Sequence, residues 1–248
     1  MWNPQQYERF KSERAQPFHD LLALVEPRPG MRVVDLGCGT GKLTRLLHEQ
    51  LEAAETLGVD SSAEMLAKAS GFATSTLRFE QTAVEAFVSQ RPFDLVFSNA
   101  ALHWVDDHPS LFARLTTMLA PGGQLAVQMP FNHGHVSQRV AAELAPQFGV
   151  PPRAPPLLAP EDYASLLHSL GYARQHVRLQ VYGHVLDSAS AVIEWVKGST
   201  LTEYQRKLGE RWPEFLETYT ERMLRELGDA RPYFFPFKRL HLWASRPS

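Results

Sequence analysis

The residues best suited to chemistry form a glycine-rich turn, V-V-D-L-G-C-G-T-G, at residues 33–41. Glycines at alternate positions let a backbone approach a ligand closely and adopt positive φ angles. A dinucleotide-binding turn has the spacing G-x-G-x-x-G and holds a pyrophosphate. This turn is G-x-G-x-G, and Asp35 stands two residues before its first glycine. That carboxylate would repel a pyrophosphate and would suit a ligand that carries an ammonium group.

A second acidic residue, Asp60, ends the next expected strand. It follows the turn by about 20 residues, where an acid can bind the hydroxyls of an adenosine ribose. The two features describe a ligand with a ribose, a cationic amino-acid end and no phosphate, and S-adenosylmethionine fits this description. The alternative is an ordinary strand–turn–helix connection made of small residues. A phosphate-binding P-loop is excluded because Leu43 follows Gly41-Lys42 where that motif needs Ser or Thr.

The elements that position these residues alternate in type along the first 130 residues. Residues 4–25 have helical spacing, and we expect Pro17 to divide them into two helices. Expected strands cover residues 32–36, 56–60, 77–81, 93–98 and 124–129. Expected helices cover residues 41–50, 62–69 (capped by Ser61 or Ser62) and 110–119. This alternation predicts an α/β fold with a mainly parallel sheet.

The second half of the chain is richer in helices. Six prolines between residues 146 and 160 predict a loop. After it we expect helices at 162–170, 189–197, 203–208 and 213–227, and strands at 174–182 and 237–244. We interpret residues 1–248 as a single domain, with 1–29 as an N-terminal helical segment. Residues from about 131 to 230 are expected to contribute a helical substrate cap over the open end of the sheet.

Composition excludes several classes of protein. The chain has 25 basic and 27 acidic residues and a net charge of −2, which argues against a nucleic-acid-binding protein. Its single cysteine, Cys38, excludes an intrachain disulfide framework and an all-cysteine metal site. The first residues lack the features of a signal peptide, and no apolar run reaches the ~18 residues of a membrane span. We therefore expect a cytoplasmic protein with no membrane partner and no metal; the oligomeric state is not indicated.

The glycine turn and Asp60 resemble those of the class I S-adenosylmethionine-dependent methyltransferases over roughly residues 30–130. The resemblance implies a Rossmann-like, seven-stranded sheet whose last strand, near residues 240–244, is antiparallel. It also implies a set of cofactor-binding residues: Asp35, Gly37, Cys38, Gly39, Asp60 and Ser61. Cys38 is expected to be a small packing residue and not a nucleophile.

Two loops after later strands belong to the same implied site. Ala83 stands where the family has an acid that binds the adenine amino group, so we expect the backbone N–H of Val84 to bind the ring. Glu85 replaces the acid only if the register slips. The family's fourth strand ends beside the transferring methyl group, where this chain has N-A-A-L-H-W at residues 99–104. This departs from the N/D-P-P-Y/F motif of amide and nucleobase methyltransferases, and we expect Asn99 and Trp104 to contact the cofactor.

The N-terminus narrows the resemblance. The pattern W-N-P-x-x-Y-x-x-F-x-x-E-R-x-x-P at residues 2–17 is similar to that of the trans-aconitate 2-methyltransferases, as are residues 126–130, 193–196 and 237–240. The resemblance implies transfer of a methyl group to a carboxylate of a small polycarboxylic acid, trans-aconitate first among them. Tyr7 is then expected over the methionine end of the cofactor. Arg14 is expected to bind the cofactor carboxylate or the acceptor.

A carboxylate acceptor sets particular demands. It is ionised at neutral pH and needs no base, so the enzyme must mainly hold two reactants in line. A polyanion favours basic side chains, and we select Arg239 and Lys197. A single basic residue is more often a solvated surface charge, and Arg239 is favoured because it lies in a family-like motif. His103 would be a general base in other chemistry; here it is expected to donate a hydrogen bond to the substrate or only to shape the pocket.

Three other functions stay open. The acceptor could be a malonyl thioester on a carrier protein, or another small acid, because fold does not fix the substrate. The chain could also bind S-adenosylmethionine without catalysis.

Overall fold

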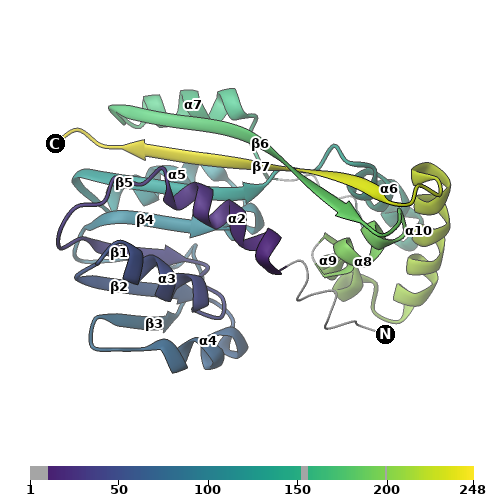
Figure 1. Cartoon of the computed structure of the whole chain (residues 1–248), viewed down its shortest axis with the longest axis horizontal. Coiled ribbons are helices and arrows are strands. Elements are labelled where there is room, and N and C mark those ends of the chain that lie inside the picture. Colours follow the sequence, from purple (N-terminus) through teal and green to yellow (C-terminus); the bar gives the residue numbers. More distant parts are fainter. Residues whose placement is uncertain (1–10, 152–155, 199) are drawn as a thin grey trace. The chain divides into compact units, whose positions relative to one another are not determined.

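The computed structural model describes residues 11–151, 156–198 and 200–248 (Figure 1). Contacts divide the chain into two compact units. The first unit combines Met1–Pro130, Pro156–Gln180 and Arg239–Ser248, and the second combines Phe131–Pro155 and Val181–Lys238. The expected role of residues from about 131 to 230 as a substrate cap stays a prediction.

One seven-stranded sheet organises the first unit, in the order β3-β2-β1-β4-β5-β7-β6. The strands are β1 (Arg32–Leu36), β2 (Glu55–Asp60), β3 (Leu77–Gln81), β4 (Phe93–Asn99), β5 (Leu119–Pro130), β6 (Arg174–Leu186) and β7 (Tyr233–Ser245). The first five are parallel, and β7 runs antiparallel to β5. This confirms the predicted α/β fold. The strand order reverses between β1 and β4, which is where ligands bind in open α/β sheets.

Helices cover both faces of this sheet. They are α2 (Lys11–Leu22), α3 (Lys42–Gln50), α4 (Ala63–Ala69), α5 (His108–Thr117) and α7 (Pro160–Ser169). Figure 1 shows α2 and α3 on one face and α5 and α7 on the other. Under α2, the buried side chains of Phe18 and Leu21 pack on Phe97, Ala126 and Trp243 of the sheet.

The expectation that Pro17 divides the first helix is wrong, because Pro17 lies inside α2. A proline removes one N–H donor from a helix and usually bends or breaks it. Here Phe18, Leu21 and Leu22 on the same helix are buried in the core. Burial of such side chains contributes about 1.5–3 kcal/mol each, which offsets the loss of one helical hydrogen bond.

Strand β5 is longer than predicted. We expected a turn at residues 121–123 before the strand, but the strand begins at Leu119. The extra residues are accommodated by a shift in register: Phe93 pairs with Leu119, whereas Leu95 pairs with Gln124. An irregularity of this kind lets glycines and a proline stay inside a strand.

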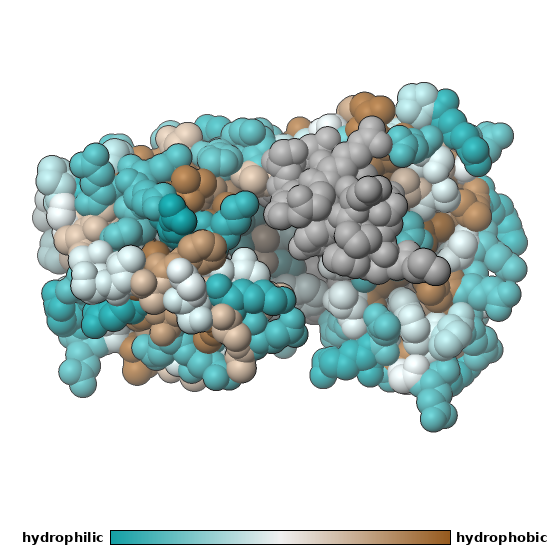
Figure 2. Space-filling model, turned by 60° about the horizontal axis from the view of Figure 1, so that its bottom comes forward, coloured by the Kyte–Doolittle hydropathy of each residue, from teal (hydrophilic) through white to brown (hydrophobic). Residues whose placement is uncertain are grey.

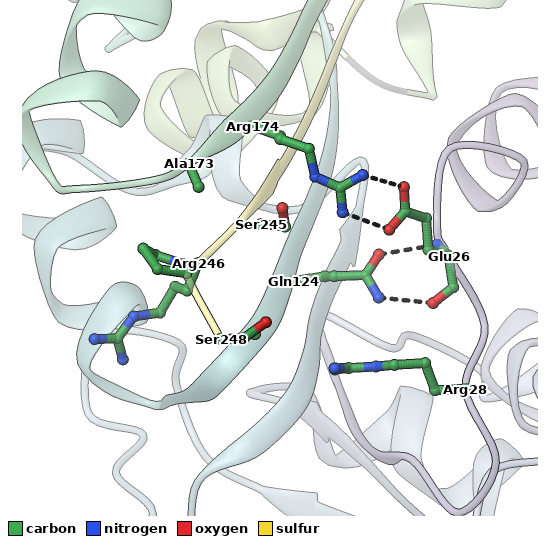
Figure 3. Close-up of a pocket in the computed structure, with 10 residues that line it drawn as sticks. Glu26, Arg28, Gln124, Ala173, Arg174, Ser245, Arg246 and Ser248 are labelled. Carbon is green, nitrogen blue, oxygen red and sulfur yellow. Dashed lines mark hydrogen bonds and ion pairs between the residues drawn. The ribbon is translucent and has the colours of Figure 1, made fainter.

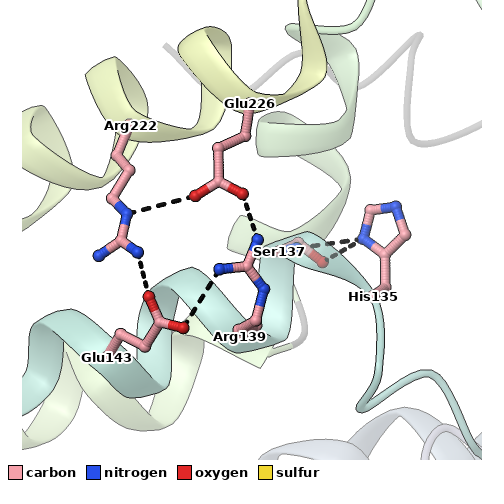
Figure 4. Close-up of polar contacts among 6 residues, drawn as sticks. All are labelled: His135, Ser137, Arg139, Glu143, Arg222 and Glu226. Carbon is pink, nitrogen blue, oxygen red and sulfur yellow. Dashed lines mark hydrogen bonds and ion pairs between the residues drawn. The ribbon is translucent and has the colours of Figure 1, made fainter.

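The second unit is mainly helical, with α6 (Val136–Leu144), α8 (Ala191–Lys197), α9 (Thr200–Leu208) and α10 (Trp212–Leu227). Helix α6 was absent from the sequence prediction. It packs on α10, where the Tyr219 hydroxyl donates to the Ser137 carbonyl at 3.0 Å. Figure 4 shows a ring of alternating charges between the two helices, formed by Arg139, Glu143, Arg222 and Glu226.

Charged and other polar residues are common in the sequence, and they cover much of the protein surface seen in Figure 2. The face in Figure 2 carries hydrophilic residues over most of its described part, and its apolar residues are scattered. Scattered apolar side chains are normal on protein surfaces. None of the helices in the described part of the chain is long and apolar enough to cross a membrane.

Candidate functional site

The glycine turn connects β1 to α3 in a conformation that only glycine adopts readily. Gly37, Gly39 and Gly41 have φ angles of 78°, 55° and 72°. A Cβ atom on Gly37 would lie 2.1 Å from the Cβ of Ala101, so that position requires glycine for packing. A Cβ on Gly39 would meet nothing within 4 Å, so the backbone there borders open space. Gly39 therefore has the room that a closely approaching ligand requires.

Asp60 ties this turn to the end of β2. Its Oδ2 accepts a hydrogen bond from the N–H of Gly39, and its Oδ1 accepts one from the N–H of Ser62, both at 2.8 Å. Ser62, and not Ser61, is the N-cap of α4. A carboxylate oxygen can accept two hydrogen bonds, so each oxygen of Asp60 keeps one position for a ligand hydroxyl. Two such positions match the two hydroxyls of a ribose.

Asp35 is almost wholly buried at the end of β1. Its Oδ2 accepts a hydrogen bond of 2.7 Å from the Thr44 hydroxyl of α3. The pKa of Asp35 is raised to about 7, mainly by burial and to a smaller extent by the nearby charge of Asp60, against the opposing effect of the Thr44 hydrogen bond. A cationic partner would stabilise the ionised form of this buried carboxyl group and would therefore lower its raised pKa.

Cys38 lies between the two first glycines and is buried. Burial, together with the nearby Asp35 and Asp60, raises the pKa of its thiol above the ordinary value. Only the thiolate is a strong nucleophile. The structure thus offers no activated nucleophile at this position.

The end of β4 carries a strained connection. Ala100 has a φ of 56°, an uncommon value for a residue with a side chain. Just before it, the Oδ1 of Asn99 is buried and has no hydrogen-bond partner within the described structure. His103 and Trp104 follow in a short helical turn, their ring centroids 4.7 Å apart, with Trp104 45% exposed. This turn therefore combines strain, a buried acceptor atom and exposed aromatic surface.

Hydrogen bonds from α5 and within the loop itself fix the segment after β3. Arg114 of α5 donates to the carbonyls of Val84 and Phe87 at 2.7 Å each. The carbonyl of Ala83 accepts from the N–H groups of Ala86 and Phe87. These bonds fix the turn that carries Ala83 and Val84.

The remaining predicted residues lie in different parts of the chain. Arg239 is on β7 of the first unit, paired in register with Pro130 and 8% exposed. Lys197 is on α8 of the second unit, where it forms an ion pair of 2.6 Å with Glu194. Tyr7 lies outside the described residues, and so does the side chain of Arg14.

Sequence reasoning missed Thr44, the partner of Asp35, and Gln128 of β5. Gln128 is fully buried, and both of its amide atoms lack hydrogen-bond partners in the described structure. A polar residue inside the apolar stretch of residues 125–129 was the available signal.

A cavity of about 250 Å³ lies elsewhere, where β5 begins and β7 ends. Figure 3 shows one ion pair at this cavity, between Arg174 and Glu26. In open α/β sheets the ligand site lies at the carboxyl ends of the parallel strands, so this cavity is not the expected one. Among the described residues no group of three or more His, Cys, Asp or Glu side chains could hold a metal ion.

Comparisons with known proteins agree with this geometry. The Methyltransferase domain family matches residues 7–177. Trans-aconitate 2-methyltransferase of Deinococcus radiodurans is 43% identical, over 99% of this chain and 98% of its own length. The enzyme of the same name from Azoarcus sp. strain BH72 is 38% identical, over 99% of both chains.

Solved structures share the fold. The YcgJ protein of Bacillus subtilis has a TM-score of 0.64 at 16% identity and covers 94% of this chain and 99% of its own. A Haemonchus contortus phosphoethanolamine N-methyltransferase 2, solved with S-adenosyl-L-methionine, has a TM-score of 0.58 at 19% identity; the match covers 94% of this chain and 52% of that one. The chain is therefore an S-adenosylmethionine-dependent methyltransferase, and it belongs to the family of the trans-aconitate 2-methyltransferases.

Proposed function

We propose that this enzyme methylates one carboxylate of trans-aconitate, giving a methyl ester and S-adenosylhomocysteine. The observation that carries the proposal is the near full-length similarity to trans-aconitate 2-methyltransferases, 43% and 38% identical. The proposal is also supported by the room at Gly39 and by Asp60, whose carboxylate bonds to the Gly39 N–H and keeps acceptor positions for ligand hydroxyls. When bound, S-adenosylmethionine supplies an electrophilic methyl group on a sulfonium ion.

The residues at the carboxyl ends of the strands divide the binding of the cofactor. Asp60, with Ser61 beside it, takes the ribose hydroxyls, and the glycine turn at Gly37–Gly39 lies against the cofactor. Asn99 Oδ1 and the Asp35 carboxylate attract the ammonium group. We assign the adenine ring to the Ala83–Val84 backbone and the methionine end to Trp104, Tyr7 and Arg14.

The acceptor needs no proton transfer before it attacks, because a carboxylate is ionised at neutral pH. The protein contributes by fixing the acceptor in line with the methyl group, which can lower the barrier by several kcal/mol. Arg239 supplies positive charge for the polyanion, and His103 donates a hydrogen bond. Lys197, which is paired with Glu194, is the weaker candidate.

The test is methyl transfer from radiolabelled S-adenosylmethionine to a panel of small polycarboxylates, measured as base-labile volatile methanol. We expect label on trans-aconitate. Label only on a malonyl thioester of a carrier protein would overturn the choice of acceptor. Cofactor binding without label on any acid would favour a binding protein instead.

The ribose assignment has its own test. Asp60→Ala removes both the expected ribose contact and the anchor of the Gly39 N–H, so we expect at least a tenfold weaker cofactor affinity in calorimetry. Affinity equal to that of the wild-type enzyme would exclude Asp60 from the site.

A further inference from the structure

Two buried glutamines of β5 differ in the hydrogen bonds of their side-chain amides. Gln124 and Gln128 lie four residues apart, so their side chains point to the same face of the sheet. Both are buried, with exposed fractions of 2% and 0%. Their amide groups therefore experience the same exclusion from water, and each should need hydrogen-bond partners inside the protein.

Both amide atoms of Gln124 have hydrogen-bond partners. Its Oε1 accepts from the N–H of Glu26 and from the Trp243 indole, both at 2.9 Å, and its Nε2 donates to the Glu26 carbonyl at 2.7 Å. Figure 3 shows the pair of bonds to Glu26. Gln128 has none within the described structure, at either amide atom. Buried unpaired amides are rare in folded proteins, and they point to a partner supplied by function.

The position of Gln128 fits such a partner. In register it lies between Asn99 of β4 and His241 of β7. The backbone carbonyl of Gln128 accepts from the N–H of Ala100, the strained residue of the β4 turn, at 2.9 Å. Gln128 thus lies at the ligand-binding edge of the sheet, whereas Gln124 lies toward the opposite edge, beside the cavity of Figure 3.

The charge around Gln128 favours an anion. Arg239, which is buried, pairs with Pro130 and therefore projects on the same face as Gln128, one row further along. His241 lies in the same row, and burial lowers the pKa of its ring, which favours the uncharged imidazole. The acidic group that faces it is Asp20 of α2, which is itself hydrogen-bonded to Gln180.

We propose that Gln128 is an acceptor-binding residue, whose Nε2 donates a hydrogen bond to a carboxylate of the polycarboxylic acid while Arg239 supplies the positive charge. The proposal rests on the proposed function. A neutral amide suits this task because it orients a carboxylate without giving it a proton, which leaves the oxygen nucleophilic. The amide atoms are buried, so the acceptor reaches them when a neighbouring side chain moves aside.

The matched variants are Gln128→Met and Gln124→Met, which remove the same amide from the same face of the same strand. An unsatisfied amide destabilises the fold and a satisfied one stabilises it. We therefore expect the Tm of Gln128→Met to equal or exceed that of the wild-type enzyme. The Tm of Gln124→Met should fall by at least about 4 °C, because its three hydrogen bonds are lost.

For acceptor binding we expect the reverse: Gln128→Met should weaken it and Gln124→Met should not. Gln128→Met should raise the KM for trans-aconitate at least tenfold and leave the Kd for S-adenosylmethionine within twofold. Gln124→Met should keep the wild-type KM. The same difference should appear in calorimetry of trans-aconitate binding to each protein saturated with S-adenosylhomocysteine, which requires no turnover.

The results separate the two proposals. If the wild-type enzyme forms no methyl ester but binds trans-aconitate in a Gln128-dependent manner, the proposed reaction fails and the binding role holds. If the ester forms and both variants bind the acid alike, the role of Gln128 fails and the reaction holds. A wild-type enzyme that binds no polycarboxylate, or a Gln128→Met variant with a large loss of Tm, would also overturn the binding role.

Discussion

The pH dependence of this enzyme should be governed by Asp35. Its pKa rises from 3.8 to about 7 because of burial, which corresponds to about 4 kcal/mol at about 1.4 kcal/mol per pH unit. Between pH 4 and 7 the folded state keeps a proton that the unfolded state has lost. The stability of the cofactor-free protein should therefore be highest below about pH 4 for this group and should fall as the pH rises to 7.

Asp35→Asn isolates this effect, because an amide cannot ionise and its oxygen still accepts the hydrogen bond from Thr44. We expect the gain in Tm of the variant over the wild-type protein to be several degrees larger at pH 8 than at pH 5, because the wild-type protein loses stability as the pH rises from 5 to about 7. The assay is thermal unfolding across this pH range without cofactor. An equal difference at both pH values would refute the raised pKa.

Cofactor affinity should show the opposite trend. The ammonium group of S-adenosylmethionine favours the ionised carboxylate, so the wild-type affinity should rise up to tenfold per pH unit below about 7. Thr44→Val removes a hydrogen bond that lowers the pKa of Asp35, and it should move the midpoint of this curve to higher pH. A flat affinity between pH 5.5 and 7.5 in calorimetry would exclude the proposed contact between Asp35 and the ammonium group.

Four further substitutions each have one main expected effect, on stability, cofactor affinity or the KM for the acceptor. Gly37→Ala should destabilise the fold by at least about 2 kcal/mol in urea unfolding, because its Cβ would overlap that of Ala101. Gly39→Ala, which meets no atom, should instead lose mainly cofactor affinity; a larger loss of stability than Gly37→Ala would contradict this. Arg239→Met should raise the KM for trans-aconitate at least tenfold at unchanged cofactor Kd, and an unaltered KM would remove Arg239 from the acceptor site. Glu143→Gln opens the charged ring of Figure 4 and should lower Tm less in 1 M salt than in dilute buffer, since exposed ion pairs are screened.

The strands were the most predictable part of this fold. Those at residues 32–36 and 77–81 match the structure in both bounds. The first is a buried apolar run, whereas the second lies at the edge of the sheet and buries only Leu77. Pro17 misled the prediction, since the burial of α2 depends on partners from β4, β5 and β7 that are distant in sequence. Helix α6 had a readable signal in Val136, Val140 and Leu144 at helical spacing, but it is short and lies before the proline-rich stretch.

The candidate site also has a part that the sequence predicts and a part that it does not. The glycine turn and Asp60 are local patterns, and the structure joins them through the Gly39–Asp60 hydrogen bond. The significance of Gln128 depends on its register with β4 and β7 and on the absence of bonds that Gln124 has. No local pattern contains that information. The same holds for Thr44, whose contact with Asp35 requires α3 to fold back over β1.

The state of Cys38 has a practical consequence for experiments on this enzyme. It is the chain's single cysteine, it is buried, and its thiol stays protonated. The thiolate is the form that attacks electrophilic thiol reagents, so the native protein should react slowly with maleimides. A cysteine introduced at an exposed position can thus be labelled selectively without first removing the natural one. One fluorophore in each of the two units would then report how their separation responds to the cofactor and to the acceptor acid.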